Sequence, residues 1–115
     1  MKEIKFSQQN ISSKGIALVN KVIKSGWLTH GSYTTNFEKE FSNFTKSKYC
    51  VTVSSCTAAL HLSCLAINLK KGDEVIVPAM THTATAHAVE LTGAKAVFVD
   101  ANSKNKKIDI NKIEK

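Results

Sequence analysis

Four small polar residues, Ser54 to Thr57, separate an apolar stretch from a helix-like pattern in the segment "VSSCTAALHL" (residues 53–62). The first N–H groups of a helix have no partner within the helix, and the helix dipole favours negative charge beside them. A strand, a short polar turn and a helix N-terminus in that order therefore form an anion site, and phosphate is its natural guest. Two interpretations stay open here: the turn binds a phosphate, or Ser55 or Thr57 only caps the helix.

The other residues that could carry chemistry favour structural roles. Asp73 and Glu74 are adjacent at the entry to an expected strand, where neighbouring side chains point to opposite faces, so we expect turn and strand-entry roles. Cys50, Cys56 and Cys64 lack CxxC spacing, which indicates neither a disulfide framework nor a zinc site and fits a reducing cytoplasm. The turn itself lacks the GxxxxGK[ST] pattern of a Walker-type loop.

The basic charge of the chain does not by itself indicate a nucleic-acid partner. Sixteen Lys and Arg against nine Asp and Glu give a formal net charge of +7. The lysines are scattered, however, and the one dense cluster, "SKNKK" (residues 103–107), has no interleaved aromatic residues to stack on bases. We expect a solvated basic surface and no nucleic-acid partner. No apolar run approaches the roughly 18 residues of a membrane span, so we also expect no membrane partner.

Two helices are expected in the first part of the chain. Apolar residues recur at helical spacing over residues 12–25, behind Ser12 and Ser13 as possible caps and before Gly26 as a stop. A second helix is expected behind Thr34 or Thr35. Its apolar stripe is predicted to be core and consists of Phe37, Phe41 and Phe44.

From Tyr49 onward, short apolar runs alternate with helical patterns. Three strands are predicted, at residues 49–53, 75–78 and 95–100, and two helices, at residues 57–68 and 84–93. Such alternation predicts an α/β fold with βαβ units and a parallel sheet flanked by helices. Asp109 is predicted to cap one more helix. Three strands leave sheet edges uncovered, which is typical of the opening of a larger domain.

Ordered blocks over most of the chain resemble one protein family. "GWLTHGSYTTNFEKEF" (residues 26–41) is similar to its G-W-[IL]-[ST]…G…FE..F segment. Residues 53–100 are similar to its run S-[NG]-G-T-x-A-L-H-L…G-D-E-V-I-V-P…T-[FY]-x-A-[ST]…G-A-x-P-V-F-V-D. The family is that of the DegT/DnrJ/EryC1/StrS sugar aminotransferases, which have the aspartate-aminotransferase fold and use pyridoxal 5'-phosphate (PLP).

The resemblance implies a role for four residues of this sequence. Ser55, Cys56 and Thr57 match the turn that holds the cofactor phosphate. Cys56 stands where the family has Gly, so a positive φ there would be costly. His82 matches the aromatic residue that stacks on the cofactor pyridine; the alternative is a loop histidine that caps the following helix. In the loop before the second helix, Thr29 and His30 are candidates for the nucleotide-sugar side of the pocket, although the resemblance does not fix them.

The resemblance also implies what the whole protein does. Residues 1–48 are expected to be an N-terminal helical segment, and residues 49–115 the truncated start of the PLP-binding large domain. The expected reaction moves an amino group from an amino acid, glutamate, to a nucleotide-linked keto-sugar in a homodimer. The cofactor lysine and the pyridine-facing carboxylate of the family match no residue here, so we expect the chain alone to be inactive. Alternatives are a PLP-dependent sugar dehydratase of the same fold and a non-catalytic fragment that binds phosphate or associates with a partner chain.

Overall fold

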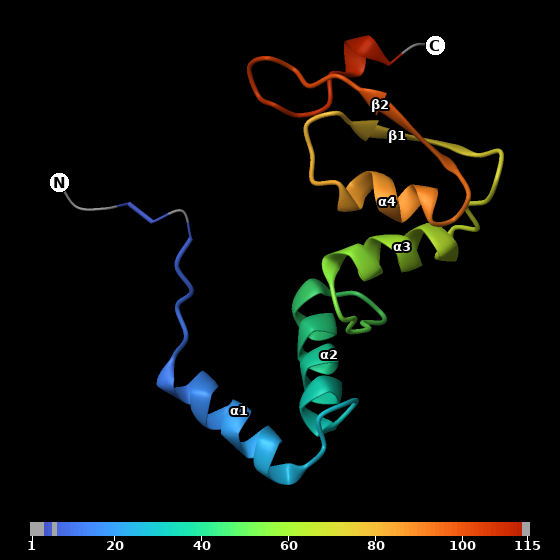
Figure 1. Cartoon of the computed structure of the whole chain (residues 1–115). Helices are drawn as coiled ribbons and strands as arrows, with labels where there is room; N and C mark the ends of the chain where they lie inside the picture. Colours follow the sequence, from blue (N-terminus) through green and yellow to red (C-terminus); the bar gives the residue numbers. More distant parts are fainter. Residues whose placement is uncertain (1–3, 6, 114–115) are drawn as a thin grey trace. The chain divides into compact units, whose positions relative to one another are not determined.

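The computed structural model describes residues 4–5 and 7–113, and the chain divides into two compact units. Unit 1 is Met1–Thr52 and unit 2 is Val53–Lys115. Unit 1 contains the two helices nearest the N-terminus, and unit 2 alternates helices with strands (Figure 1). Each unit is described by itself below.

Helix α1 of unit 1 spans Ser13–Ser25 and has the predicted ends. The Ser12 hydroxyl oxygen accepts the Gly15 N–H at 3.1 Å, which satisfies one of the unpaired donors of the first turn. Gly26 closes the helix with φ +70°, a left-handed conformation that glycine adopts without a Cβ penalty. Both end signals act within four residues, which explains why the sequence alone located them.

Helix α2 spans Ser32–Thr45, so the predicted start behind Thr34 or Thr35 is wrong by three or four residues. The helix begins earlier because extended Gly31 is the N-cap, and its carbonyl accepts the Thr35 N–H at 3.2 Å without a side-chain cap. The Phe37 and Phe41 rings stack with centroids 5.7 Å apart. The expectation that the phenylalanine stripe is core is also wrong for this chain, since all three rings are exposed and Phe44 is 84% exposed.

The segment 49–53, predicted to be a strand, has no strand structure. Its backbone donor at Thr52 is bound by a side chain: Glu38 Oε1 accepts the Thr52 N–H at 2.8 Å and the Thr52 hydroxyl at 2.7 Å. A strand requires a neighbouring backbone to pair with, and the described residues supply none here. Within the described residues, the sheet therefore contains two strands in place of the three that were predicted.

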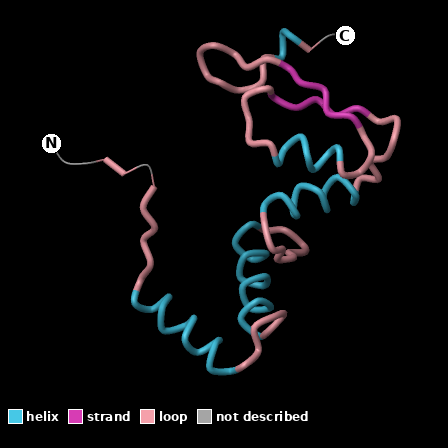
Figure 2. Tube along the Cα trace, viewed as in Figure 1, coloured by secondary structure: helices cyan, strands magenta, loops and turns pink. Residues whose placement is uncertain are grey.

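Unit 2 follows the order α3 (Cys56–Ala66), β1 (Glu74–Pro78), α4 (Ala84–Glu90) and β2 (Lys95–Val99), as Figure 2 shows. The strands are parallel, and their register runs from Glu74 opposite Lys95 to Pro78 opposite Val99. Helix α4 connects them as a βαβ crossover and packs on both strands and on α3. The α/β fold with a parallel sheet is confirmed by this arrangement.

A small apolar core holds unit 2 together. Val77 of β1, Val89 of α4 and Ala94 are buried together, with Cys64 and Leu69 packed against them. Helix α4 ends at Glu90 with right-handed Leu91 as its C-cap, so the predicted helix of residues 84–93 is too long at its C-terminal end; Gly93, with a left-handed φ of +84°, lies in the turn that leads into β2. Burial of these residues orients α4 on the sheet and so fixes the loop that precedes α4.

The last element of the described residues is a short 3₁₀ turn, Ile110–Lys112, which Asp109 caps by accepting the Asn111 N–H at 3.1 Å. The predicted cap is thus confirmed, although the helix it begins is a single turn. Among the helices of residues 4–5 and 7–113, none is long and apolar enough to cross a membrane.

Candidate functional site

The polar turn before α3 places Ser55 at the N-cap position. Ser55 has extended backbone angles, its hydroxyl oxygen accepts the Ala58 N–H at 3.1 Å, and its carbonyl accepts the Ala59 N–H at 3.1 Å. The capping role left open in the sequence analysis is therefore confirmed for Ser55. Thr57 lies in the second position of the helix, where it is not the cap.

Two backbone donors remain unused at this end of α3. In the part of the chain that the structure describes, the N–H groups of Cys56 and Thr57 donate to no protein acceptor. Residues 53–57 contain no acidic side chain to compete for them. The donors and the positive end of the helix dipole together suit an anion.

Cys56 has helical backbone geometry and is absent from the residues with positive φ. The cost expected where cysteine replaces the family's glycine thus does not arise in this conformation. The Cys56 side chain is exposed and Thr57 is half-buried. The turn therefore presents a free thiol beside the two unused donors.

His82 lies in the loop between β1 and α4, two residues before that helix begins. Its Nδ1 accepts the Ala84 N–H at 3.1 Å, and its carbonyl accepts the Thr85 N–H at 3.0 Å. The structure thus shows the helix-capping contact that was the alternative to stacking. The contact uses one edge of the ring and leaves the ring exposed.

Two surface hollows of unit 2, each of about 370 Å³, contain the predicted residues separately. Thr57 lines one and His82 lines the other. His87 and Glu90 of α4 line both, so these hollows adjoin along one helix. Thr57 does not line the hollow that contains His82, and His82 does not line the one that contains Thr57.

The sequence analysis selected neither His87 nor Glu90 as a site residue. His87 is exposed and lines both hollows, and Glu90 Oε1 accepts the Ala96 N–H of β2 at 2.7 Å. The two residues are three apart on α4, which places them on one face. The three-residue spacing of His87 and Glu90 could have indicated a shared helix face from the sequence. Only the packing of α4 on β2 shows where that face lies in the structure.

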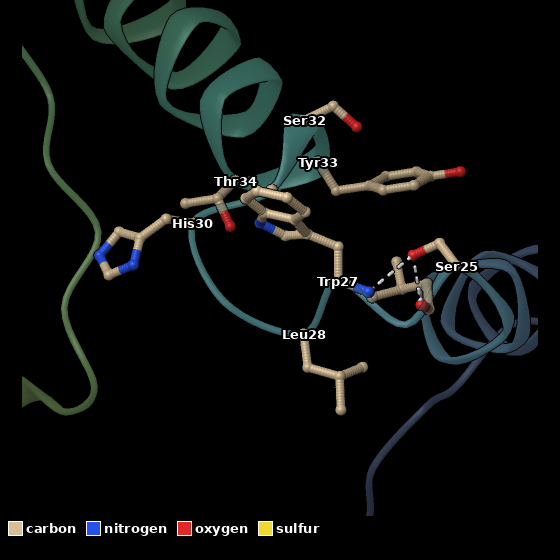
Figure 3. A pocket seen from close by; sticks show the side chains of 9 residues that line it. Ser25, Trp27, Leu28, His30, Ser32, Tyr33 and Thr34 are labelled. Carbon is tan, nitrogen blue, oxygen red and sulfur yellow. Dashed lines mark hydrogen bonds between the residues drawn. The ribbon is translucent and has the colours of Figure 1, made fainter.

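The loop between α1 and α2 surrounds a separate hollow of about 410 Å³ within unit 1 (Figure 3). The Trp27 ring packs so closely on Gly31 that a Cβ there would meet Trp27 Cδ1 at 2.9 Å. The Trp27 N–H donates to Ser25 Oγ at 3.2 Å, and that hydroxyl donates to the Val22 carbonyl at 2.7 Å. His30 lines this hollow and Thr29 does not.

Asp73 and Glu74, for which the sequence analysis predicts structural roles, make contacts within the fold, and so does Asp100. Asp73 Oδ2 accepts the Lys70 N–H at 2.9 Å in the turn before β1, and Glu74 pairs with Lys95 across the strands at 2.9 Å. Turn and strand-entry roles are therefore confirmed for Asp73 and Glu74. Asp100 pairs with Lys112 at 2.7 Å, and this hydrogen bond lowers the pKa of the Asp100 carboxyl.

The described residues contain no group of His, Cys, Asp or Glu side chains arranged to hold a metal ion. The donors of the candidate site are backbone N–H groups, hydroxyls and an imidazole edge. Such groups bind anionic and aromatic ligands by hydrogen bonding and stacking.

Curated relatives and solved structures support the same interpretation. The chain is 37% identical over 99% of its length to the GDP-perosamine synthase of Escherichia coli O157:H7 and covers 32% of that protein. It is 38% identical over 90% of its length to the UDP-4-amino-4-deoxy-L-arabinose–oxoglutarate aminotransferase of Shewanella sediminis and covers 27% of it. The chain thus spans about a third or less of these relatives.

Among solved structures, Spr1654 of Streptococcus pneumoniae, assigned as a sugar aminotransferase, matches in its PMP form with a TM-score of 0.88 and 36% identity. That match covers 96% of this chain and 28% of the other. The E. coli GDP-4-keto-6-deoxy-D-mannose-3-dehydratase with bound hydrated PLP matches with a TM-score of 0.86 and 31% identity, over 96% of this chain and 30% of that one. The model of the DegT/DnrJ/EryC1/StrS aminotransferase family matches residues 9–115, and the chain belongs to this family.

Proposed function

We propose that this chain is the N-terminal, phosphate-binding part of a PLP-dependent aminotransferase. In the complete protein, the amino group of an amino acid, glutamate, is transferred to a nucleotide-linked keto-sugar. The relatives that are named as a perosamine synthase and an aminoarabinose aminotransferase support the substrate class. The two unused N–H donors at the start of α3 are the observation that carries the proposal.

The residues of the turn fit the cofactor phosphate. The N–H groups of Cys56 and Thr57 and the Thr57 hydroxyl would donate to its oxygens, and the dipole of α3 would favour its charge. The Ser55 oxygen already accepts a hydrogen bond from the helix, but its hydrogen remains available to donate.

The imidazole of His82 provides the stacking surface in this proposal. Its Nδ1 edge is anchored to Ala84, so the ring has a fixed orientation while its face stays open. Capping and stacking are therefore compatible roles of one side chain. An imidazole face is smaller than that of the family's Phe or Tyr, so it holds the cofactor ring less firmly.

PLP supplies an electron-withdrawing ring that stabilises negative charge at the carbon bearing the transferred amino group. This chain's residues bind and orient it. Since no lysine here matches the family's cofactor lysine, we expect the isolated chain to be inactive. Borohydride treatment after incubation with PLP is expected to label no single lysine stoichiometrically; one such site contradicts this assignment.

A sugar dehydratase of the same fold is the second candidate, because the dehydratase structure matches almost as well as Spr1654. Mass spectrometry of the products of the complete protein, given glutamate and a nucleotide-linked keto-sugar, distinguishes the two. An aminated sugar supports the aminotransferase, and a deoxy-sugar without nitrogen supports the dehydratase. We include in the same proposal that the complete protein is a cytoplasmic homodimer. If neither product forms, the remaining alternative is a non-catalytic module that associates with a partner chain.

The exposed Cys56 thiol allows a direct test of the phosphate position. PLP is expected to slow alkylation of Cys56 by iodoacetamide, because the phosphate covers the turn. Pyridoxal, which lacks the phosphate, is expected to protect it much less. Cys64, half-buried farther along α3, is the internal control whose alkylation is unaffected. Equal protection by PLP and pyridoxal would mean that the phosphate lies elsewhere.

Variants of the turn test the same position by absorbance titration with PLP. Thr57→Ala removes one hydroxyl but leaves the N–H donors, so a loss of about 1 to 2 kcal/mol is expected. Thr57→Glu is expected to be far worse, since a carboxylate occupies the donors and repels the phosphate. Cys56→Gly restores the family residue and is expected to bind at least as well. Parent-like affinity of Thr57→Glu contradicts the proposal.

A further inference from the structure

Strand β2 pairs with β1 along one side, and β1 is the only strand beside it in the part of the chain that the structure describes. The Lys95 N–H donates to the carbonyl of Asp73, directly before β1, at 2.9 Å. Successive residues of a strand turn their backbone groups to opposite sides. The N–H and C=O groups of Ala96 and Phe98 therefore point away from β1. A free row of this kind is able to pair with another strand.

The carboxylate of Glu90 occupies part of this free edge. Its Oε1 accepts the Ala96 N–H at 2.7 Å, the length of a charge-assisted hydrogen bond. The oxygen thus takes the place that a carbonyl of a neighbouring strand would occupy. Glu90, Ala96 and Phe98 line one hollow beside α4, so the side chain reaches the edge from the helix that packs on the sheet. The side chain of Phe98 is 59% exposed.

The core of unit 2 holds both partners of this contact in place. Ala88 and Val89, which directly precede Glu90 in α4, are buried. Ala94, two residues before Ala96, is buried in the same cluster as Val89. Short chain segments therefore join the acceptor and the donor to buried residues, and the contact spans only six residues of sequence.

The free edge of β2 is complementary to the same edge of a second copy. Two-fold symmetry brings identical surfaces together and sets the two β2 strands antiparallel, with Ala96 of each copy opposite Phe98 of the other. Residues that face each other in this way exchange both N–H···O=C bonds. With Glu90 in place, the Ala96 N–H is already bonded and the second strand cannot approach it.

We propose that the outer edge of β2 is a strand-pairing surface for a second copy of this chain and that Glu90 keeps this surface closed. The surface consists of the N–H and C=O groups of Ala96 and Phe98. Removal of the Glu90 side chain frees the Ala96 N–H, and two copies then join their sheets through β2. The inference does not depend on PLP binding.

The test is residue-resolved amide hydrogen exchange of the full chain at rising protein concentration. In Glu90→Ala, pairing between copies is expected to slow exchange of the Phe98 N–H about tenfold or more, the scale of a few backbone hydrogen bonds. In the parent, exchange at Phe98 is expected not to depend on concentration, even where other exposed surfaces associate. No slowing in Glu90→Ala overturns the inference, and so does concentration-dependent slowing at Phe98 in the parent.

Two further variants act on the hydrogen bond itself. Glu90→Gln keeps an oxygen that accepts the Ala96 N–H, so its edge is expected to stay closed. Ala96→Pro removes the N–H, and proline is tolerated at a strand edge whose N–H faces away from the sheet. The pattern G-A-x-P-V-F-V-D also has proline at the position of Ala96. Glu90→Ala combined with Ala96→Pro is expected to exchange at Phe98 like the parent; slowing as strong as in Glu90→Ala alone overturns the inference.

The matched control is Glu40→Ala, which removes the same charge from an exposed position of α2 and is expected to follow the parent. Amide protection of Val89, in the core, reports whether unit 2 stays folded in each variant. One measurement needs no variant. In the dilute parent, the Ala96 N–H is expected to exchange at least about tenfold more slowly than the Phe98 N–H, because only the former is bonded to Glu90. Equal exchange at the two positions overturns the inference.

Discussion

The two units of the chain differ in where their apolar side chains lie. In unit 2, Val77, Ala88, Val89, Ala94 and Val99 are buried. In unit 1, by contrast, neither helix contains a buried residue, although both have apolar stripes. A crossover helix on two parallel strands encloses a small core by itself, whereas single amphipathic helices require another surface to cover them. The unit with a core is also the one that carries the candidate site.

The largest expected effect comes from placing the same charged residue at an apolar position in each unit. Val89→Asp puts a carboxylate at a position 3% exposed, which is expected to cost about 3 to 5 kcal/mol of unit 2 stability. Val19→Asp in α1, at a position 57% exposed, is expected to change stability by about 0.5 kcal/mol or less. Residue-resolved amide hydrogen exchange measures both, because Trp27 and both tyrosines lie in unit 1 and give no signal for unit 2. Similar losses in the two units would contradict the comparison.

Glycine substitutions are expected to have opposite signs in the two units. Gly93→Ala forces a left-handed φ of +84° on a residue with a Cβ, at a cost of about 1 to 2 kcal/mol. Gly15→Ala lies within α1, where a Cβ meets nothing closer than 3.5 Å, and is expected to stabilise the helix by up to about 1 kcal/mol. Hydrogen exchange of α1 and of β2 measures the two effects. A stabilising Gly93→Ala would show that the turn before β2 is not left-handed.

The two serine caps allow a matched comparison of structure with binding. Ser12→Ala and Ser55→Ala each remove a cap bond of 3.1 Å, and each is expected to cost about 1 kcal/mol of local helix stability. Only Ser55→Ala is expected also to weaken PLP binding, since it removes a hydroxyl from the phosphate turn. Helicity by circular dichroism and PLP titration separate the two effects. Equal PLP affinity of Ser12→Ala and Ser55→Ala would mean that Ser55 caps α3 but does not bind the phosphate.

The smallest expected effect concerns two carboxylates with a lowered pKa. The Thr52 N–H and hydroxyl lower the pKa of Glu38 from its ordinary value of 4.5, and the hydrogen bond from Lys112 lowers that of Asp100 from 3.8. Each contribution to stability is present above the ordinary pKa and is lost as the pH falls through the lowered one. We expect Glu38→Gln and Asp100→Asn each to reduce the loss of stability between pH 6 and 2. Urea unfolding at a series of pH values measures this loss.

Salt distinguishes the two carboxylates. Added salt weakens the pair of Asp100 with the Lys112 cation, whereas the Glu38 contact with neutral donors depends on salt much less. We expect 0.5 M NaCl to reduce the pH effect of Asp100→Asn more than that of Glu38→Gln. Equal reduction would mean that the carboxylate of Glu38 is stabilised by surrounding charge and not by Thr52.

Several helix ends were predictable because their causes are local. Ser12, Ser55 and Asp109 cap the segments that follow them, and Gly26 ends α1 in the left-handed conformation. The start of α2 was misplaced because Gly31 begins it through its backbone alone, without a side-chain signal. The turn before α3 was also located from local signals, namely polar residues directly before a helical pattern, and the family resemblance supported it.

The sequence by itself determined where the chain can be helical, the alternation of helices with strands after Tyr49, and the polar turn that opens α3. The tertiary structure decided whether residues 49–53 pair as a strand, because Glu38 binds the Thr52 N–H from fourteen residues away. It also decided that the phenylalanine stripe of α2 is exposed. Caps and turns depend on atoms a few residues apart, whereas strand pairing and burial depend on partners that no local pattern identifies.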